Sequence, residues 1–117
     1  MGKTYAGYSD GYGTRGPCVV LVLARERWEA LAVPGPHDSA DVWWGDGGSG
    51  ALVLASAILA DHFGYVPPAD LCRQFTWDVV GRWPQGWSWR LDTPAIDAWL
   101  DRVAARATRL ARRPQQP

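Results

Sequence analysis

The residues best suited to binding chemistry form a glycine-rich stretch, Gly45-Asp46-Gly47-Gly48-Ser49-Gly50. The apolar residues 51–63 follow directly and predict a buried helix that begins here and ends at Gly64. Free N–H groups at a helix N-terminus attract anions, and glycine lets a ligand approach the backbone closely. One hypothesis is therefore a small anion or nucleotide site. It would use Gly47, Gly48, Ser49 and Gly50.

A structural role for the same stretch is the favoured alternative. No lysine follows the glycines, as it does in phosphate-binding loops, and Asp46 would repel a phosphate. Ser is a preferred N-cap residue, and glycines usually answer a need of the backbone. We therefore expect Ser49 to cap a tight entry into the helix.

Catalysis and metal binding have little support in the spacing of reactive residues. Ser49 and His62 lie 13 residues apart on the expected helix, about 20 Å and too far for a hydrogen bond. Cys18 and Cys72 show no zinc-type spacing and indicate small buried side chains. We expect no catalytic residues, no metal and no cofactor, and hence a protein that is not an enzyme.

Charge is balanced in total but not along the chain. Twelve Lys and Arg match 12 Asp and Glu, yet residues 26–78 carry 2 − 8 = −6 and residues 79–117 carry 7 − 3 = +4. Four arginines form one stripe beside the apolar seam of the expected last helix. They are Arg102, Arg106, Arg109 and Arg113. This stripe predicts contact with an acidic protein surface or with nucleic-acid phosphates, and the alternative is a solvated helix face.

Eight tryptophans are a high number for 117 residues. Five fit core positions of the expected elements: Trp28, Trp83, Trp87, Trp89 and Trp99. Neighbouring residues of a strand point to opposite faces, so Trp43 and Trp44 do not both fit one core. Trp77 lies off the apolar arc of its helix. Trp43, Trp44 and Trp77 are therefore candidate partner-binding residues, or else a second packing layer under the loop of residues 34–41.

The pattern of apolar residues predicts the elements that must position these side chains. Strands are expected at residues 4–8, 18–23 (buried on both faces), 28–33 and 87–91, with a short edge strand at 42–44. Helices are expected at 51–63, from 67 to about 83, and from 94 to about 112, the last capped by Thr93. This order predicts an α+β fold, a small antiparallel sheet of three or four strands packed on one face by about three helices. We expect residues 1–113 to form one domain and residues 114–117 to form a frayed tail.

The motif Trp44-Gly45-Asp46-Gly47-Gly48-Ser49-Gly50, followed by an Ala/Leu-rich helix, resembles a known bacterial family. That family is the group of small proteins called domain of unknown function 6166, and the resemblance covers most of residues 4–100. It departs at Gly50-Ala51, where Gly-Pro is expected, and in the basic extension after Leu100. The resemblance implies no catalytic residue. It implies a setting on phages, plasmids and other mobile elements.

We therefore expect a non-enzymatic accessory protein of a mobile element that binds a host protein or defence complex, in the manner of an anti-CRISPR-like inhibitor. Anion or nucleotide binding at the glycine loop, and nucleic-acid binding by the basic helix, are the alternatives. The longest apolar run is about ten residues, too short to span a membrane, and no apolar leader is evident. A cytoplasmic location follows as an expectation, with no prediction of the oligomeric state.

Overall fold

Four strands form one antiparallel sheet in the computed structural model, which describes residues 2–10 and 17–112. They are β1 (Thr4–Ser9), β2 (Cys18–Ala24), β3 (Arg27–Ala30) and β4 (Trp89–Asp92), in the spatial order β3-β2-β1-β4. The turn between β2 and β3 has positive φ at both Arg25 and Glu26, which suits a tight hairpin between twisted strands. Strand β3 returns antiparallel to β2, but it ends at Ala30 and not at the expected residue 33.

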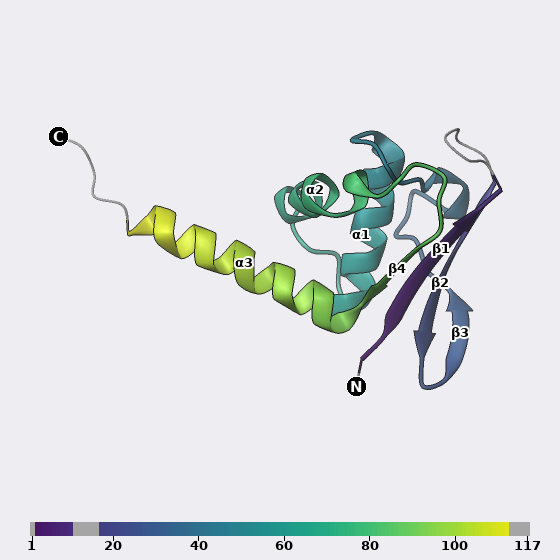
Figure 1. Ribbon diagram of the computed structural model, residues 1–117, viewed down its shortest axis with the longest axis horizontal. Coiled ribbons are helices and arrows are strands. Elements are labelled where there is room, and N and C mark those ends of the chain that lie inside the picture. The colour runs from purple at the N-terminus through teal and green to yellow at the C-terminus, as the bar shows by residue number, and fades with distance from the viewer. Residues whose placement is uncertain (1, 11–16, 113–117) are drawn as a thin grey trace.

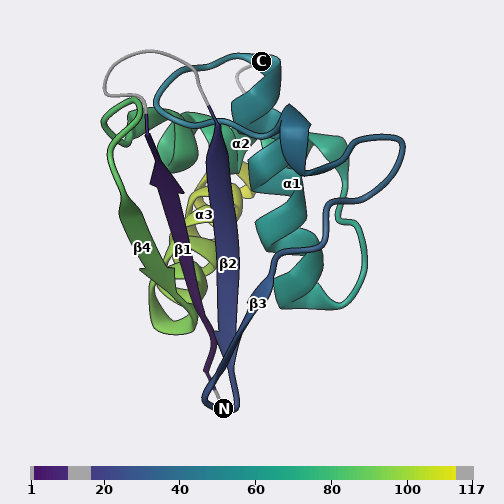
Figure 2. The same ribbon diagram turned by 90° about the vertical axis from the view of Figure 1, so that its right-hand side faces the viewer.

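Three helices complete the fold. They are α1 (Ser49–Phe63), α2 (Ala69–Asp78) and α3 (Thr93–Ala111), with short 3-10 helices η1 (Ser39–Asp41) and η2 (Val80–Arg82). All three helices lie on one side of the sheet, as Figures 1 and 2 show together. The predicted α+β class, with a small antiparallel sheet covered on one face, is therefore confirmed.

None of the described residues forms a helix over the opposite face of the sheet, and this face corrects one expectation. Strand β2 is apolar throughout, but it alternates in burial: Val22 is buried on the helix side, whereas Val19 is 53% exposed. In Figure 2 the sheet faces the viewer with the helices behind it. The prediction that β2 is buried on both faces is therefore wrong.

Helix α1 forms the centre of the core. It buries residues on most of its circumference: Gly50, Ala51, Val53, Leu54, Ala55, Ala57, Ile58 and Leu59. Its C-terminal end is Gly64 in the left-handed conformation, as expected. Its N-cap is Gly48, without a side-chain hydrogen bond, and Ser49 is already the first helical residue. The prediction that Ser49 caps this helix is wrong.

Trp43 and Trp44 are the largest fully buried side chains of the core, 1% and 0% exposed. Residues 42–44 form no strand but an irregular segment between η1 and α1. Strand alternation therefore does not apply, and both rings turn inward and stack with centroids 4.9 Å apart. Trp44 Nε1 also donates to the carbonyl oxygen of Trp87 at 2.9 Å. These two residues belong to the packing alternative, and the expectation that they contact a partner is wrong.

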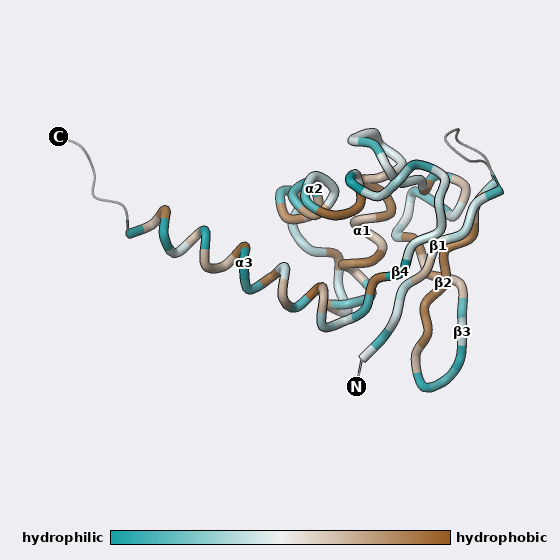
Figure 3. The backbone as a smooth tube through the Cα atoms, in the orientation of Figure 1, coloured by the Kyte–Doolittle hydropathy of each residue, from teal (hydrophilic) through white to brown (hydrophobic). Residues whose placement is uncertain are grey.

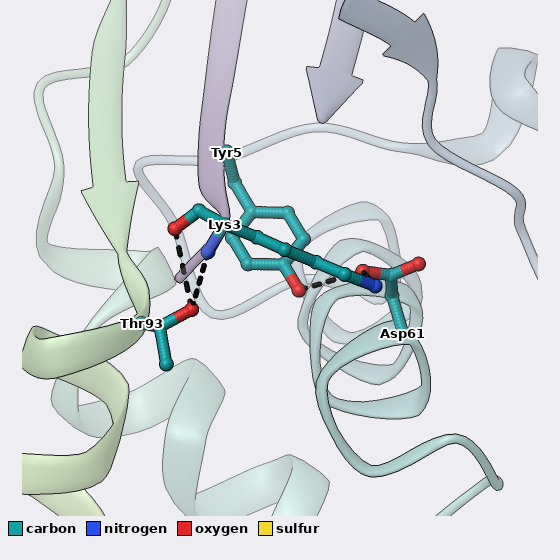
Figure 4. A network of polar contacts seen from close by, with 4 residues as sticks. All are labelled: Lys3, Tyr5, Asp61 and Thr93. Atoms are coloured by element: carbon teal, nitrogen blue, oxygen red, sulfur yellow. Dashed lines mark hydrogen bonds and ion pairs between the residues drawn. The ribbon is translucent and has the colours of Figure 1, made fainter. Parts of the chain in front are cut away.

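Polar contacts fasten β1 to α1 and to the start of α3 (Figure 4). The hydroxyl of Tyr5 and the ammonium of Lys3 both donate to Asp61 Oδ2, at 2.7 and 3.0 Å. The backbone N–H of Lys3 donates to Thr93 Oγ1 at 2.8 Å. Thr93 is therefore not the N-cap of α3. That role belongs to Asp92, whose Oδ1 accepts from the N–H of Ala95 at 3.0 Å.

Only the first half of α3 is anchored in the core. Ile96 and Trp99 are its two buried residues, and the Trp99 ring packs edge-on against Phe75 with centroids 4.8 Å apart. Trp99 Nε1 donates to Asp78 Oδ2 at 2.9 Å, which fixes α3 to the end of α2. Helix α2 ends at Asp78 instead of continuing to residue 83 as predicted, and η2 follows.

Candidate functional site

Helix α3 leaves the body of the protein after Val103. Residues 104–111, here called the arm, are eight consecutive helical residues that are all exposed. Figure 1 shows this part of α3 projecting away from the other helices and the sheet. The molecule measures 55 Å along its longest axis and only 33 and 26 Å along the others.

The sequence explains why the arm is helical without support from the body. Residues 102–112 contain Arg, Ala and Leu at nine of eleven positions, all with high helix propensity. Nucleation is the costly step of helix formation, and the packed turns around Ile96 and Trp99 supply it. The arm then needs only propagation, one residue at a time.

An apolar stripe runs from the anchored part of α3 onto the arm, where no described residue covers it. Val103, Ala107 and Leu110 follow each other at i, i+4 and i+7 and form this stripe, here called the seam. Val103 still packs against the core, but Ala107 is exposed and Leu110 is 56% exposed. In Figure 3, brown apolar residues alternate with teal hydrophilic residues along α3. The seam thus continues the buried face of α3 into solvent.

Arginines run along one side of the seam. Arg102, Arg106 and Arg109, three of the four residues predicted for the stripe, are exposed on α3, and Arg112 extends the row. Arg113 lies outside the described residues. Within the part of the chain that the structure describes, no carboxylate lies within 4.0 Å of these four guanidinium groups. Their charge is therefore available to a partner.

Trp77 is on the surface as expected, at 73% exposure, but Trp43 and Trp44 are buried, so the three do not form one exposed cluster. The structure brings it beside the glycine-rich loop instead. A shallow cavity of about 250 Å³ is lined by Gly47, Gly48, Ser49, Leu52, Arg73, Thr76 and Trp77. Trp77 and the glycine-rich loop, which the sequence predicts as two separate candidate sites, therefore lie on one surface.

The glycine-rich stretch, residues 45–50, is here called the joint because two of its glycines pack closely against other segments of the chain. A Cβ at Gly50 would lie 2.9 Å from the Cβ of Trp43, and one at Gly45 would lie 2.5 Å from the Cα of Gln85. Asp46 Oδ1 accepts from the N–H of Gly48 at 2.9 Å, so a carboxylate already occupies the entry to α1. This geometry supports the structural role. Anion binding at Gly47, Gly48, Ser49 and Gly50 stays a prediction.

The uncovered face of the sheet carries aromatic residues that the sequence assigned to the core or left aside. Tyr8 and Trp28 are exposed there, and the Arg90 guanidinium lies 5.7 Å from the centre of the Trp28 ring. Trp87, also predicted to be buried, is exposed as well. All four residues of β3 are exposed, and Arg27 and Glu29, which point to the face opposite Trp28, are the sequence signal that this strand lies outside the core.

The titratable cluster at Asp61 is structural. Burial, together with the hydrogen bond to the Asp61 carboxylate, raises the pKa of the Tyr5 hydroxyl far above its ordinary value. Tyr5 therefore stays protonated at neutral pH and serves as a hydrogen-bond donor. No group of three His, Cys, Asp or Glu among the described residues could hold a metal ion. Within the same residues, no helix is both long and apolar enough to cross a membrane.

Comparison with known proteins yields one match. No curated protein and no solved structure is found to match the chain. A model of the family of unknown function DUF6166 matches residues 10–102, which include the glycine-rich joint, α1, α2 and the anchored half of α3. The arm follows directly after this match. The chain belongs to the DUF6166 family.

Proposed function

We propose that this protein is a non-enzymatic binding module and that its arm docks into a groove of another protein. The observation that carries the proposal is the seam, an apolar stripe that continues into solvent on a projecting helix. Residues at i, i+4 and i+7 are the usual anchors of an amphipathic helix in a groove. Val103, Ala107 and Leu110 have this spacing.

The energetics favour a binding role for the seam over a role in the fold. Burying a leucine side chain fully stabilises a protein by about 1.5–3 kcal/mol, and Leu110 leaves most of that unused because it is more than half exposed. Binding to a partner that covers Leu110 and Ala107 gains this unused free energy of burial. The arm is already helical, so little ordering entropy opposes binding.

For the biological setting we propose an accessory protein of a mobile element, acting in the cytoplasm, that blocks a host protein or defence complex. A projecting helix can inhibit by occupying a surface of its target, which requires no chemistry from the binder. The resemblance of the glycine-rich motif and its helix to proteins of such elements motivates this setting.

Site-specific photocrosslinking tests the proposal. A benzoyl-phenylalanine replaces Ala107 on the seam or, as a matched control, Ala98, which is also exposed on α3 but nine residues away on the opposite side. Each full-length variant is irradiated in cells that naturally carry the gene. We expect an adduct with a different protein from position 107 and none from position 98. Equal yields from both positions, or no protein adduct from either, contradict the proposal.

A further inference from the structure

We propose that the groove that receives the arm is walled by carboxylates along one side and closely packed along the other. This inference rests on the proposed function and adds the chemistry of the partner. The argument uses the charge, the side-chain size and the exposure of the residues around the seam.

The arginine side of the arm has an uncompensated positive charge. Residues 102–112, which end with the C-cap of α3, contain four arginines and no acidic residue, so this stretch of about 15 Å carries +4. On the helical wheel the four lie within about 120°, starting directly beside the seam. A helix in a groove places such side chains against the wall, where paired carboxylates match the forked geometry of guanidinium groups.

The other side of the seam has a different character. Ala104 and Ala111 flank the seam there, and both are exposed. Because both side chains end in a single methyl group, a partner can approach the helix backbone closely on this side. Neither side chain can form an ion pair with that partner. The partner's second wall therefore packs tightly against the helix, and its carboxylates line only the first wall.

The arm of a second copy of this chain does not fit this arm. After Asp101, the chain offers no carboxylate up to Arg112, so the arginines of two arms packed along their seams would find no acidic partner in each other. Antiparallel packing would also set Arg106 of each arm against the arginine side of the other. Like charges at this distance oppose association.

Charge and apolar surface together favour a protein over a nucleic acid or a lipid surface. Phosphates would pair with the arginines but would leave Leu110 uncovered. Helices that lie in a membrane interface present a broad apolar face with Trp, Phe or Leu, whereas Leu110 is the one large apolar side chain of the arm and the others are alanines. An acidic-walled groove satisfies both surfaces of the arm.

The test measures the adduct at position 107 in four full-length backgrounds. The first is unchanged. The second carries Arg106→Glu and Arg109→Glu, and the third Arg106→Lys and Arg109→Lys. The fourth carries Arg25→Glu and Arg27→Glu in the β2–β3 hairpin, which changes the net charge equally at a distant exposed site.

We expect the adduct yield to fall about tenfold or more with the Glu pair on the arm, and by less than about threefold with the Lys pair or the hairpin control. In the unchanged background the yield should also fall as NaCl rises from about 50 to 500 mM. An adduct that is indifferent to salt and to the arm Glu pair overturns the acidic wall but leaves the binding role intact. A dimeric adduct overturns the inference in favour of a second copy.

Two further measurements separate the failure of this inference from the failure of the proposed function. The unchanged protein is sedimented with phosphatidylserine vesicles and run with a 20-base-pair DNA duplex in a mobility shift. Both proposals are overturned if no protein adduct forms and the protein binds the vesicles or the DNA in a way that the Glu pair on the arm abolishes. The arm then binds that probe.

Discussion

The clearest consequence of the arm is that its seam should contribute almost nothing to the stability of the fold, whereas the anchored half of α3 should contribute much. Ile96 is fully buried, so Ile96→Ala should lower the free energy of unfolding by about 2–5 kcal/mol. Leu110 is mostly exposed, and glutamine has nearly the same helix propensity as leucine. Leu110→Gln should therefore change the free energy of unfolding by less than about 0.5 kcal/mol.

Urea unfolding followed by tryptophan fluorescence, together with thermal unfolding, measures both variants. At an unfolding entropy of about 2.1 cal/mol/K per residue, 1 kcal/mol corresponds to about 4 °C in Tm for this chain. Ile96→Ala should lower Tm by about 8–20 °C and Leu110→Gln by at most about 2 °C. If Leu110→Gln lowers Tm as much as Ile96→Ala, the seam packs within the fold and the reasoning for a partner fails.

Three further predictions concern the joint, the tyrosine and the arm. Gly50→Ala should lower the free energy of unfolding by about 1–3 kcal/mol because its Cβ would press on Trp43, whereas Gly47→Ala, with open space around it, should change it by less than about 0.5 kcal/mol in the same urea assay. The pKa of Tyr5 is raised in the fold, so its stabilisation is complete below the unfolded value of about 10 and falls above it by about 1.4 kcal/mol per pH unit. Tyr5→Phe should remove this part of the slope between about pH 10 and 11, and an unchanged slope would contradict the assignment. Sedimentation equilibrium should find a monomer at low salt, because the arms repel each other, and a stable dimer would refute that argument.

Local patterns along the chain predict most of this fold. The apolar run of β2, the polar turn at Arg25 and Glu26 and the return in β3 define the hairpin from neighbouring residues alone. The almost wholly apolar segment before Gly64 likewise defines α1 as a buried helix. These elements follow from sequence because their periodicity and their turn residues agree.

Features that depend on distant segments are less predictable. Trp43 and Trp44 are both buried because the chain around them is irregular, so strand alternation misplaces them. Thr93 has a suitable position for an N-cap, but its hydroxyl pairs with Lys3, 90 residues away, and Asp92 takes the cap. The N-cap of α1 lies at Gly48 in place of Ser49, a shift of one residue.

The candidate site shows the same division. The arginine stripe of α3 is visible in the sequence because it depends only on helical spacing. That the body of the protein ends near Val103 is not visible, since it depends on how far α2 and the sheet extend alongside α3. The proximity of Trp77 to the glycine-rich loop also arises from the packing of α2 beside α1.

Hydrogen exchange of the full chain, alone and with the protein recovered from the position 107 adduct, tests most directly whether the arm is the binding element. In the free protein we expect fast exchange in residues 104–111 and slow exchange around Ile96 and Trp99. On binding, exchange in the arm should slow by about tenfold or more, while the β1–β2 ladder stays unchanged. Slowing confined to the outer strands or to the surface around Trp77, with an unchanged arm, would contradict the account.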